Sequence, residues 1–414
     1  MIALAEIIER FEAPFLLHYQ TRLLPSQAQA LAAMKRCRTS FAPRMLAQCM
    51  ACGEQRSVPH SCGHRSCPHC QHHEGEVWLK RQLAAQVPAT YFMITFTLPA
   101  QLRALAWAHQ RVVYALLMQC AWETLNTFSH NDNKLRATPG AVGVLHTHNR
   151  RLELHPHVHM VMPAAALDAK KNLWRTKSRR PRRGARVTAA NSSNSTADGT
   201  AHSPSSGGYL FSHKALAKVF RGKLLDALKL AGLALPPAVP EQWVVDCKCV
   251  GDGSKALLYL SRYLYRGVIQ EKDILRCEDG KVTFQYRDAK TGKMGQRTLA
   301  GEDFLWLVLQ HVLPKGLRRS RNFGYLHPNS AGAIRVLQLL HLRSVNTAGP
   351  PTPPRPTWSC ACGQPMVVLL RRLPALQTLA RVEASNRHRA QTPRVTPLDK
   401  RDKPFTAQVK TMQH

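Results

Sequence analysis

The stretch RLELHPHVHMVMP, residues 151–163, decides the fold, because its polar and apolar residues alternate with a period of two. Alternate residues of a β-strand share a face. The positions expected to point into a core are Val158, Met160 and Met162. His157 and His159 then lie together on the opposite face, where one strand can present two imidazoles to a divalent ion.

A second strand is expected immediately before it, in AVGVLHTH at residues 141–148. If the two strands form a hairpin through Asn149 and Arg150, the imidazole of His146 comes close to the first pair. A third metal ligand is therefore expected on this strand, at His146, or at Glu153. Two or three histidines that leave positions open to water are typical of a catalytic metal site rather than a structural one.

The segments around this hairpin predict an α+β fold with a central antiparallel sheet flanked by helices. Residues 91–99, YFMITFTLP, have the pattern of a strand, and a long helical stretch follows over residues 100–128. Residues 212–233 resume a helical period that ends near a glycine, and residues 281–299 predict a β-hairpin.

The helix expected at residues 255–266, KALLYLSRYLYR, carries two tyrosines one turn apart. At about 100° per residue, its leucines cover one side of the helix, and Tyr265 falls near them as a packing residue. The opposite side collects two aromatic and three cationic side chains: Tyr259, Tyr263, Lys255, Arg262 and Arg266. Tyrosines that share a face with cations, rather than with the leucines, indicate phosphate chemistry.

Tyrosine is a weak nucleophile at its ordinary pKa of about 10, but cations and a phosphate-bound metal make its phenolate accessible. A phosphotyrosine conserves the energy of a broken phosphodiester, so no nucleotide cofactor is required. The sequence agrees, since it contains neither a GxxxxGK[ST] loop nor a GxGxxG motif.

The charge of the chain indicates a nucleic-acid partner. The chain has 58 Lys and Arg against 25 Asp and Glu, a formal charge of +33, which draws a protein onto nucleic acid through phosphate neutralisation. No run of 18 apolar residues occurs, so we expect no membrane span. Clustered cysteines are more often metal ligands than disulfides in a reducing compartment, and we expect a cytoplasmic, nucleoid-associated bacterial protein.

Half of the twelve cysteines lie between Cys37 and Cys70. Two CxxC pairs, Cys49 with Cys52 and Cys67 with Cys70, have a spacing typical of a four-cysteine structural Zn²⁺ site. Cys37, Cys62, His64 and His69 crowd the same segment, so a swapped ligand or a second site stays open. Farther along, Cys360 and Cys362 have no obvious partner pair, and a second zinc site built on them is doubtful.

These motifs resemble the IS91-like transposases of the HUH endonuclease superfamily over most of residues 30–330. SCGHRSCPHCQ is similar to that family's zinc module, YFMITFTLP to its first motif and HPHVHMVMP to its HUH region. The resemblance implies that His157 and His159 hold the catalytic ion. His146, expected from the hairpin rather than from the resemblance, is either a third ligand or a hydrogen-bonding neighbour. YLSRYLYR is similar to the two-tyrosine motif, which implies that Tyr259 and Tyr263 are the nucleophiles.

The resemblance implies a mobile-element enzyme that nicks and joins single-stranded DNA by rolling-circle transposition, with Mg²⁺ or Mn²⁺ at the histidines. Single-stranded transposon ends and target DNA are its expected partners. Arginines of HVLPKGLRRSRNFG, a segment similar to a downstream family segment, are expected to bind phosphate with the helix cations: Arg318, Arg319 and Arg321.

Two alternatives remain. A rolling-circle replication initiator uses the same chemistry, and the motifs alone do not separate it from a transposase, although the zinc module favours the latter. A non-catalytic zinc protein that binds DNA would require the histidine and tyrosine faces to be coincidental.

The expected organisation has four parts. Residues 1–80 form an N-terminal helix and zinc module, and residues 85–270 form the nuclease domain with a basic, Ser-rich insertion at 169–208. Residues 271–345 form a hairpin and helix extension that binds DNA, and residues 346–414 form a Pro-rich linker and basic tail.

Overall fold

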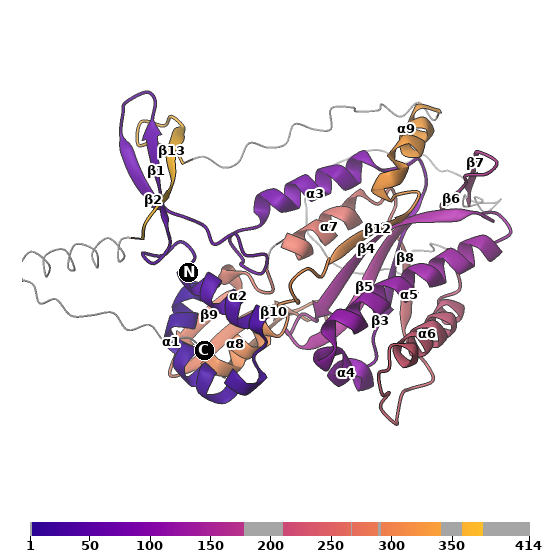
Figure 1. Ribbon diagram of the computed structural model, residues 1–414, viewed down its shortest axis with the longest axis horizontal. Helices are drawn as coiled ribbons and strands as arrows, with labels where there is room; N and C mark the ends of the chain where they lie inside the picture. Colours follow the sequence, from indigo (N-terminus) through magenta and orange to yellow (C-terminus); the bar gives the residue numbers. More distant parts are fainter. Residues whose placement is uncertain (1, 178–209, 266, 289–290, 341–357, 376–414) are drawn as a thin grey trace, which may run out of the picture.

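The computed structural model describes residues 2–177, 210–265, 267–288, 291–340 and 358–375 (Figure 1). Most of the expected insertion, most of the tail and Arg266 lie outside the described residues. The helices are α1 (Leu4–Tyr19), α2 (Pro25–Arg36), α3 (His72–Ala84), α4 (Arg103–Ala108), α5 (Gln110–Asn131), α6 (His213–Leu230), α7 (Ser254–Tyr265), α8 (Gly301–Leu309) and α9 (Ala331–Leu340), with short 3-10 turns η1 (Gln20–Arg22), η2 (Ala100–Leu102), η3 (Glu271–Asp273) and η4 (Pro328–Ser330).

The strands form three sheets. Their bounds are β1 (Arg44–Cys49), β2 (Gln55–Pro59), β3 (Tyr91–Thr97), β4 (Thr138–His148), β5 (Leu154–Pro163), β6 (Ala165–Asp168), β7 (Leu173–Thr176), β8 (Val245–Cys249), β9 (Ile274–Glu278), β10 (Lys281–Arg287), β11 (Met294–Ala300), β12 (Ser320–Gly324) and β13 (Met366–Leu373). The α+β class with antiparallel sheets, expected from the sequence, is confirmed.

The largest sheet has seven strands in the order β7-β6-β4-β5-β3-β8, and β12 pairs with β4 beside β6. Helices cover both faces (Figure 1). Val158, Met160 and Met162 enter the core under α5 and α6, as expected from their alternation. Val161 and Val144 face the other way, into the core under α3 and α7, so the histidines of β4 and β5 also face α7.

A second core joins the two halves of the sequence. Apolar side chains of α1, such as Ile7 and Phe15, pack with Phe304 of α8 and Phe284 of β10. The N-terminal helices α1 and α2 therefore pack with the 271–313 segment. The hairpin of β1 and β2, which carries Cys49 and Cys52, contributes none of the described residues of this core. α3 packs on α7, and β12 extends the large sheet, so the packing does not follow the expected boundaries at residues 80 and 271.

The third sheet has the order β13-β1-β2 and stands apart from the other two (Figure 1). β1 and β2 form a hairpin, and β13, from more than 300 residues later, pairs antiparallel with β1 from Cys49↔Met366 to Arg44↔Leu373. Strand β13 is thus part of the cysteine-rich module, together with the β1–β2 hairpin.

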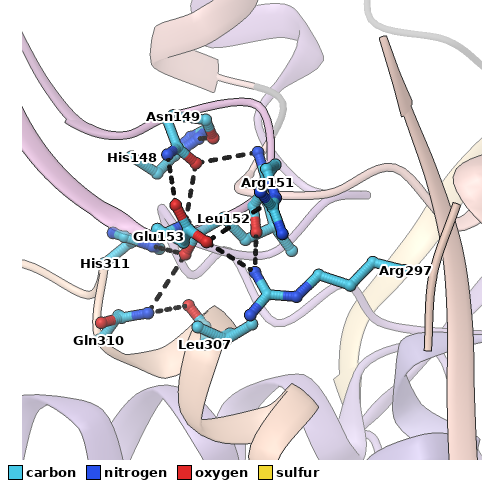
Figure 2. Close-up of polar contacts among 9 residues, drawn as sticks. All are labelled: His148, Asn149, Arg151, Leu152, Glu153, Arg297, Leu307, Gln310 and His311. Atoms are coloured by element: carbon cyan, nitrogen blue, oxygen red, sulfur yellow. Dashed lines mark hydrogen bonds and ion pairs between the residues drawn. The ribbon is translucent and has the colours of Figure 1, made fainter. Parts of the chain in front are cut away.

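The turn between β4 and β5 connects the large sheet to the second core (Figure 2). The carboxylate of Glu153 accepts hydrogen bonds from Asn149 at 2.9 Å and from Arg297 of β11 at 3.4 Å. Leu152 has a φ of 64°. Its side chain is buried and its carbonyl oxygen accepts hydrogen bonds from Gln310 and His311, and these contacts hold the residue in this conformation. Glu153 therefore stabilises the turn between β4 and β5 and lies outside the histidine cluster, so it is not the third ligand.

Within the part of the chain that the structure describes, every helix is too short or too polar to span a bilayer.

Candidate metal and tyrosine site

Three histidines from two adjacent strands meet under α7. One nitrogen each from His146, His157 and His159 lies within 4.8 Å of the others. The register explains the arrangement, because His146 of β4 is paired with His157 of β5 and His159 follows two residues along the same face. The structure thus brings together the three residues expected from the sequence to hold a divalent ion.

The free ring nitrogens of these histidines suit a metal. Nδ1 of His157 donates a hydrogen bond to the carbonyl oxygen of His155 at 2.6 Å, which leaves its Nε2 with a lone pair. Nδ1 of His159 shares a hydrogen bond of 2.8 Å with the hydroxyl of Thr95. Nε2 of His146 is buried without a hydrogen-bond partner among the described residues. A buried ring nitrogen without a protein partner fits a metal ligand.

Burial keeps these imidazoles neutral. Desolvation lowers the pKa of His157 to about 4 and that of His159 to about 3, and it lowers the pKa of His146 well below its ordinary value. Neighbouring histidines lower the pKa of His146 and His159 further, because two imidazolium ions at this separation repel. The neutral form is the one that coordinates a metal.

Tyr263 lies against the histidine cluster. Its ring stacks on His146 with centroids 3.3 Å apart, and the guanidinium of Arg319 lies 5.2 Å from the ring centroid. Its hydroxyl accepts a hydrogen bond of 3.0 Å from the backbone N–H of Thr147. That N–H is available because the pairing of β4 and β5 shifts between His146 and His148.

Tyr259 lies one turn earlier on α7 and is accessible. It is 50% exposed, and its ring centroid is 6.2 Å from both His146 and His159. Burial raises the pKa of Tyr259 and of Tyr263, and Arg150 and Arg319 respectively oppose this rise without reversing it. Both phenols are therefore protonated in this state. Tyr265 instead packs against Gly75 of α3.

The cations of α7 are dispersed. Lys255 is exposed on the first turn of the helix. Arg262, expected to hold phosphate with the tyrosines, lines a cavity of about 290 Å³ beside His72 and Glu76 of α3. It lies on the flank of the helix that faces α3, because it is rotated by about 100° from Tyr263.

The downstream arginines line a larger cavity of about 1240 Å³ between α3, the end of α7, β12 and α9. Arg318, Arg319 and Arg321 contribute to its wall with Arg65 and Arg81, and none of the described residues that line it is acidic. Arg319 also donates a hydrogen bond to the carbonyl of Leu264 and lies over the ring of Tyr263, so this one residue links the wall of the cavity to the tyrosine.

The four cysteines expected to share one zinc ion are divided between two clusters. Cys67 and Cys70 lie with Cys37 and Cys62, whereas Cys49 and Cys52 lie with Cys360 and Cys362. The β1–β2 hairpin separates them, because Cys49 ends β1 and Cys52 lies in the turn that follows, whereas Cys62 to Cys70 come after the other end of β2. Five residues of strand span about 17 Å, too far for one tetrahedral site.

Two residues that form hydrogen bonds with histidines of β5 were not predicted from the sequence. Thr95 of β3 is paired with His159, and Arg103 of η2–α4 bonds Nδ1 of His155 at 2.8 Å. The alternation of YFMITFTLP places Thr95 on the polar face, but only the strand register shows that it meets His159.

Two family models match the chain. The family model described as "Putative transposase" matches residues 140–332, and that described as "Transposase zinc-binding domain", of the IS91 type, matches residues 7–98. The first match spans the histidines and both tyrosines, and the second spans the six N-terminal cysteines. The chain belongs to the IS91-like transposases.

Two curated relatives have matching names. This transposase is 28% identical to "Putative transposase y4qJ" of Sinorhizobium fredii, over 78% of this chain and 79% of the relative. It is 25% identical to "Transposase for insertion sequence element IS801" of Pseudomonas savastanoi pv. phaseolicola, over 67% of this chain and 64% of the relative. No solved structure matches it significantly. A transposase is a DNA-binding enzyme that cuts and transfers DNA strands, and this one carries a zinc-binding domain with clustered cysteines.

Proposed function

We propose that this transposase nicks and joins single-stranded DNA by rolling-circle transposition through 5′-phosphotyrosine intermediates. The observation that carries the proposal is the position of two tyrosines of α7 over three convergent, neutral histidines. When bound at these histidines, Mg²⁺ or Mn²⁺ would polarise the scissile phosphate. The names of the two relatives favour a transposase over a replication initiator.

We assign the first cleavage to Tyr259, because it is exposed beside the histidines and its hydroxyl accepts no hydrogen bond among the described residues. Its phenol oxygen bonds to phosphorus while the P–O3′ bond breaks. The phenol proton is lost to solvent and the 3′ oxygen takes up a proton, which leaves a free 3′-OH and a 5′-phosphotyrosine. Tyr263 must first give up its bond to Thr147, so we assign it the second transfer.

The decisive experiment uses the whole protein with Mn²⁺ and single-stranded oligonucleotides tiled across the DNA that flanks its coding sequence. We expect a denaturation-resistant adduct on one or a few oligonucleotides, absent with EDTA and on the same sequences as duplex. Peptide mass spectrometry is expected to place the DNA on Tyr259. Failure of every oligonucleotide to form an adduct with any divalent ion, or an adduct outside α7, would contradict the proposal.

We further propose that the arginine-lined cavity guides the DNA strand to Tyr263. Arg81, Arg318 and Arg321 make no ion pair within the described residues, so their guanidinium groups are available for phosphates. Guanidinium groups bind phosphate oxygens in pairs, which fixes the strand as well as attracting it. Arg65 has a different role, since it is bonded to the carbonyls of Leu313 and Leu317.

Replacing Arg318 and Arg321 together with Gln is expected to weaken single-stranded DNA binding. The slope of log K against log salt is negative, and each lost phosphate contact makes it shallower by about 0.7. The double variant should therefore have a slope that is shallower by about 1.4. Binding measured by fluorescence anisotropy at several salt concentrations checks this. The matched control replaces Lys218 and Lys229, exposed on α6 across the sheet, with Gln. Equal slopes in the two double variants would mean that the cavity is not the DNA path.

A further inference from the structure

A second set of four cysteines lies where the turn of the β1–β2 hairpin meets the segment that leads into β13. Sγ of Cys49 lies 3.5 Å from Sγ of Cys362, and Sγ of Cys52 lies 3.4 Å from Sγ of Cys360. All four sulfurs lie within 4.8 Å of one another. Four thiolates around one zinc ion at about 2.3 Å are separated by about 3.8 Å, whereas a disulfide brings two sulfurs to about 2.05 Å. The spacing is that of a metal site.

The two halves of this set have the same local fold, although their sequence spacing differs by one residue. Cys49 N–H donates to the carbonyl of Glu54, and Gly53 N–H donates to the carbonyl of Cys49. In the second half, Cys360 N–H donates to the carbonyl of Gln364, and Gly363 N–H donates to the carbonyl of Cys360. Each is a tight turn that places two cysteine side chains on one side.

A glycine in the left-handed region completes both turns. Gly53 has a φ of 75° and Gly363 a φ of 82°, a conformation that costs other residues about 1 kcal/mol or more. The second turn therefore keeps the backbone features of a metal-binding knuckle despite its Cys-x-Cys spacing.

The module lacks the apolar core that would hold three strands together. Its buried cluster consists of Ala47, Cys49, Cys360 and Met366, with Trp358 packed beside them. On β13, Val367, Leu369 and Leu370 are exposed. Sheets this small are held by a metal or disulfides rather than by apolar burial.

We propose that Cys49, Cys52, Cys360 and Cys362 bind a second structural zinc ion, which fastens the C-terminal strand β13 onto the N-terminal β1–β2 hairpin. The carboxylate of Glu54 accepts a hydrogen bond of 3.0 Å from the Cys360 thiol. Zinc replaces that thiol proton, so binding at this site releases protons. The zinc-binding module is then assembled from both ends of the chain, and a chain that lacks the C-terminal part cannot complete it.

The experiment counts zinc in the full chain, purified under reducing conditions without chelator. We expect two zinc ions per wild-type chain by native mass spectrometry. The Cys360→Ser/Cys362→Ser variant should keep one, the Cys37→Ser/Cys70→Ser variant should keep one, and the combination of all four changes should keep none. Cys249→Ser, an exposed cysteine outside both clusters, is the control and should keep two.

A measurement on the unaltered chain guards against variants that fail to fold. Chelation should raise amide hydrogen exchange in residues 44–49 and in residues 366–373 together, because they share one ladder. Three results would overturn the proposal: one zinc per wild-type chain that the Cys360/Cys362 double variant retains, disulfides between the two halves with no zinc, or exchange in residues 366–373 that chelation leaves unchanged.

Discussion

The Tyr259→Phe/Tyr263→Phe double variant is expected to form no covalent adduct with single-stranded DNA. Phenylalanine keeps both rings, so the stacking on His146 and the helix packing persist while the two nucleophilic oxygens are lost. Removal of a nucleophile lowers kcat by roughly a millionfold in a well-studied hydrolase, which would put the adduct below detection. Adduct formation on denaturing gels with the cleaved oligonucleotide measures this.

The single variants separate the two tyrosines. Tyr259→Phe is expected to lose most of the first-strand adduct, whereas Tyr263→Phe should keep that adduct and fail to complete the second transfer. Tyr265→Phe is the matched control from the same helix, and it should behave as the wild type because its ring packs on α3. A Tyr263→Phe variant that loses the first adduct while Tyr259→Phe retains it would reverse the proposed order.

Replacement of His157 and His159 by Ala is expected to abolish nicking and leave DNA affinity nearly unchanged. A metal supplies several kcal/mol of charge stabilisation to the chemical step, which corresponds to at least about a thousandfold in rate. Affinity arises instead from many Lys and Arg contacts to phosphate in a chain with a formal charge of +33. Single-turnover cleavage rates and filter binding on the same oligonucleotide test both parts.

A milder change tests the metal role separately from folding. Thr95→Val has nearly the same shape but removes the hydroxyl that bonds Nδ1 of His159. Loss of such an outer partner lowers metal affinity by about 10- to 100-fold, so higher Mn²⁺ should restore the cleavage rate. Cleavage by the His157/His159 variant at the wild-type rate, or a Thr95→Val defect that added Mn²⁺ does not relieve, would exclude the histidine cluster as the metal site.

The α+β class and the elements around the site follow from local patterns. Alternation in residues 151–163 correctly predicts which side chains enter the core, because side-chain direction in a strand depends only on position along the chain. The helical period similarly separates Tyr259 and Tyr263 from Tyr265. Each of these inferences concerns neighbours within one element, where geometry is fixed by the backbone.

The sequence alone therefore determined the candidate metal ligands and nucleophiles, and the element that carries each of them. These are the histidines on two strands, the tyrosines on one helix and the CxxC pairs in turns. Tertiary structure decided which of them meet. It divided the cysteines because a stiff hairpin separates Cys52 from Cys67, and it brought Cys360 to Cys52 from 308 residues away. It also left Tyr259 exposed and placed the ring of Tyr263 against His146, because strand register and helix packing depend on contacts between segments that no local periodicity encodes.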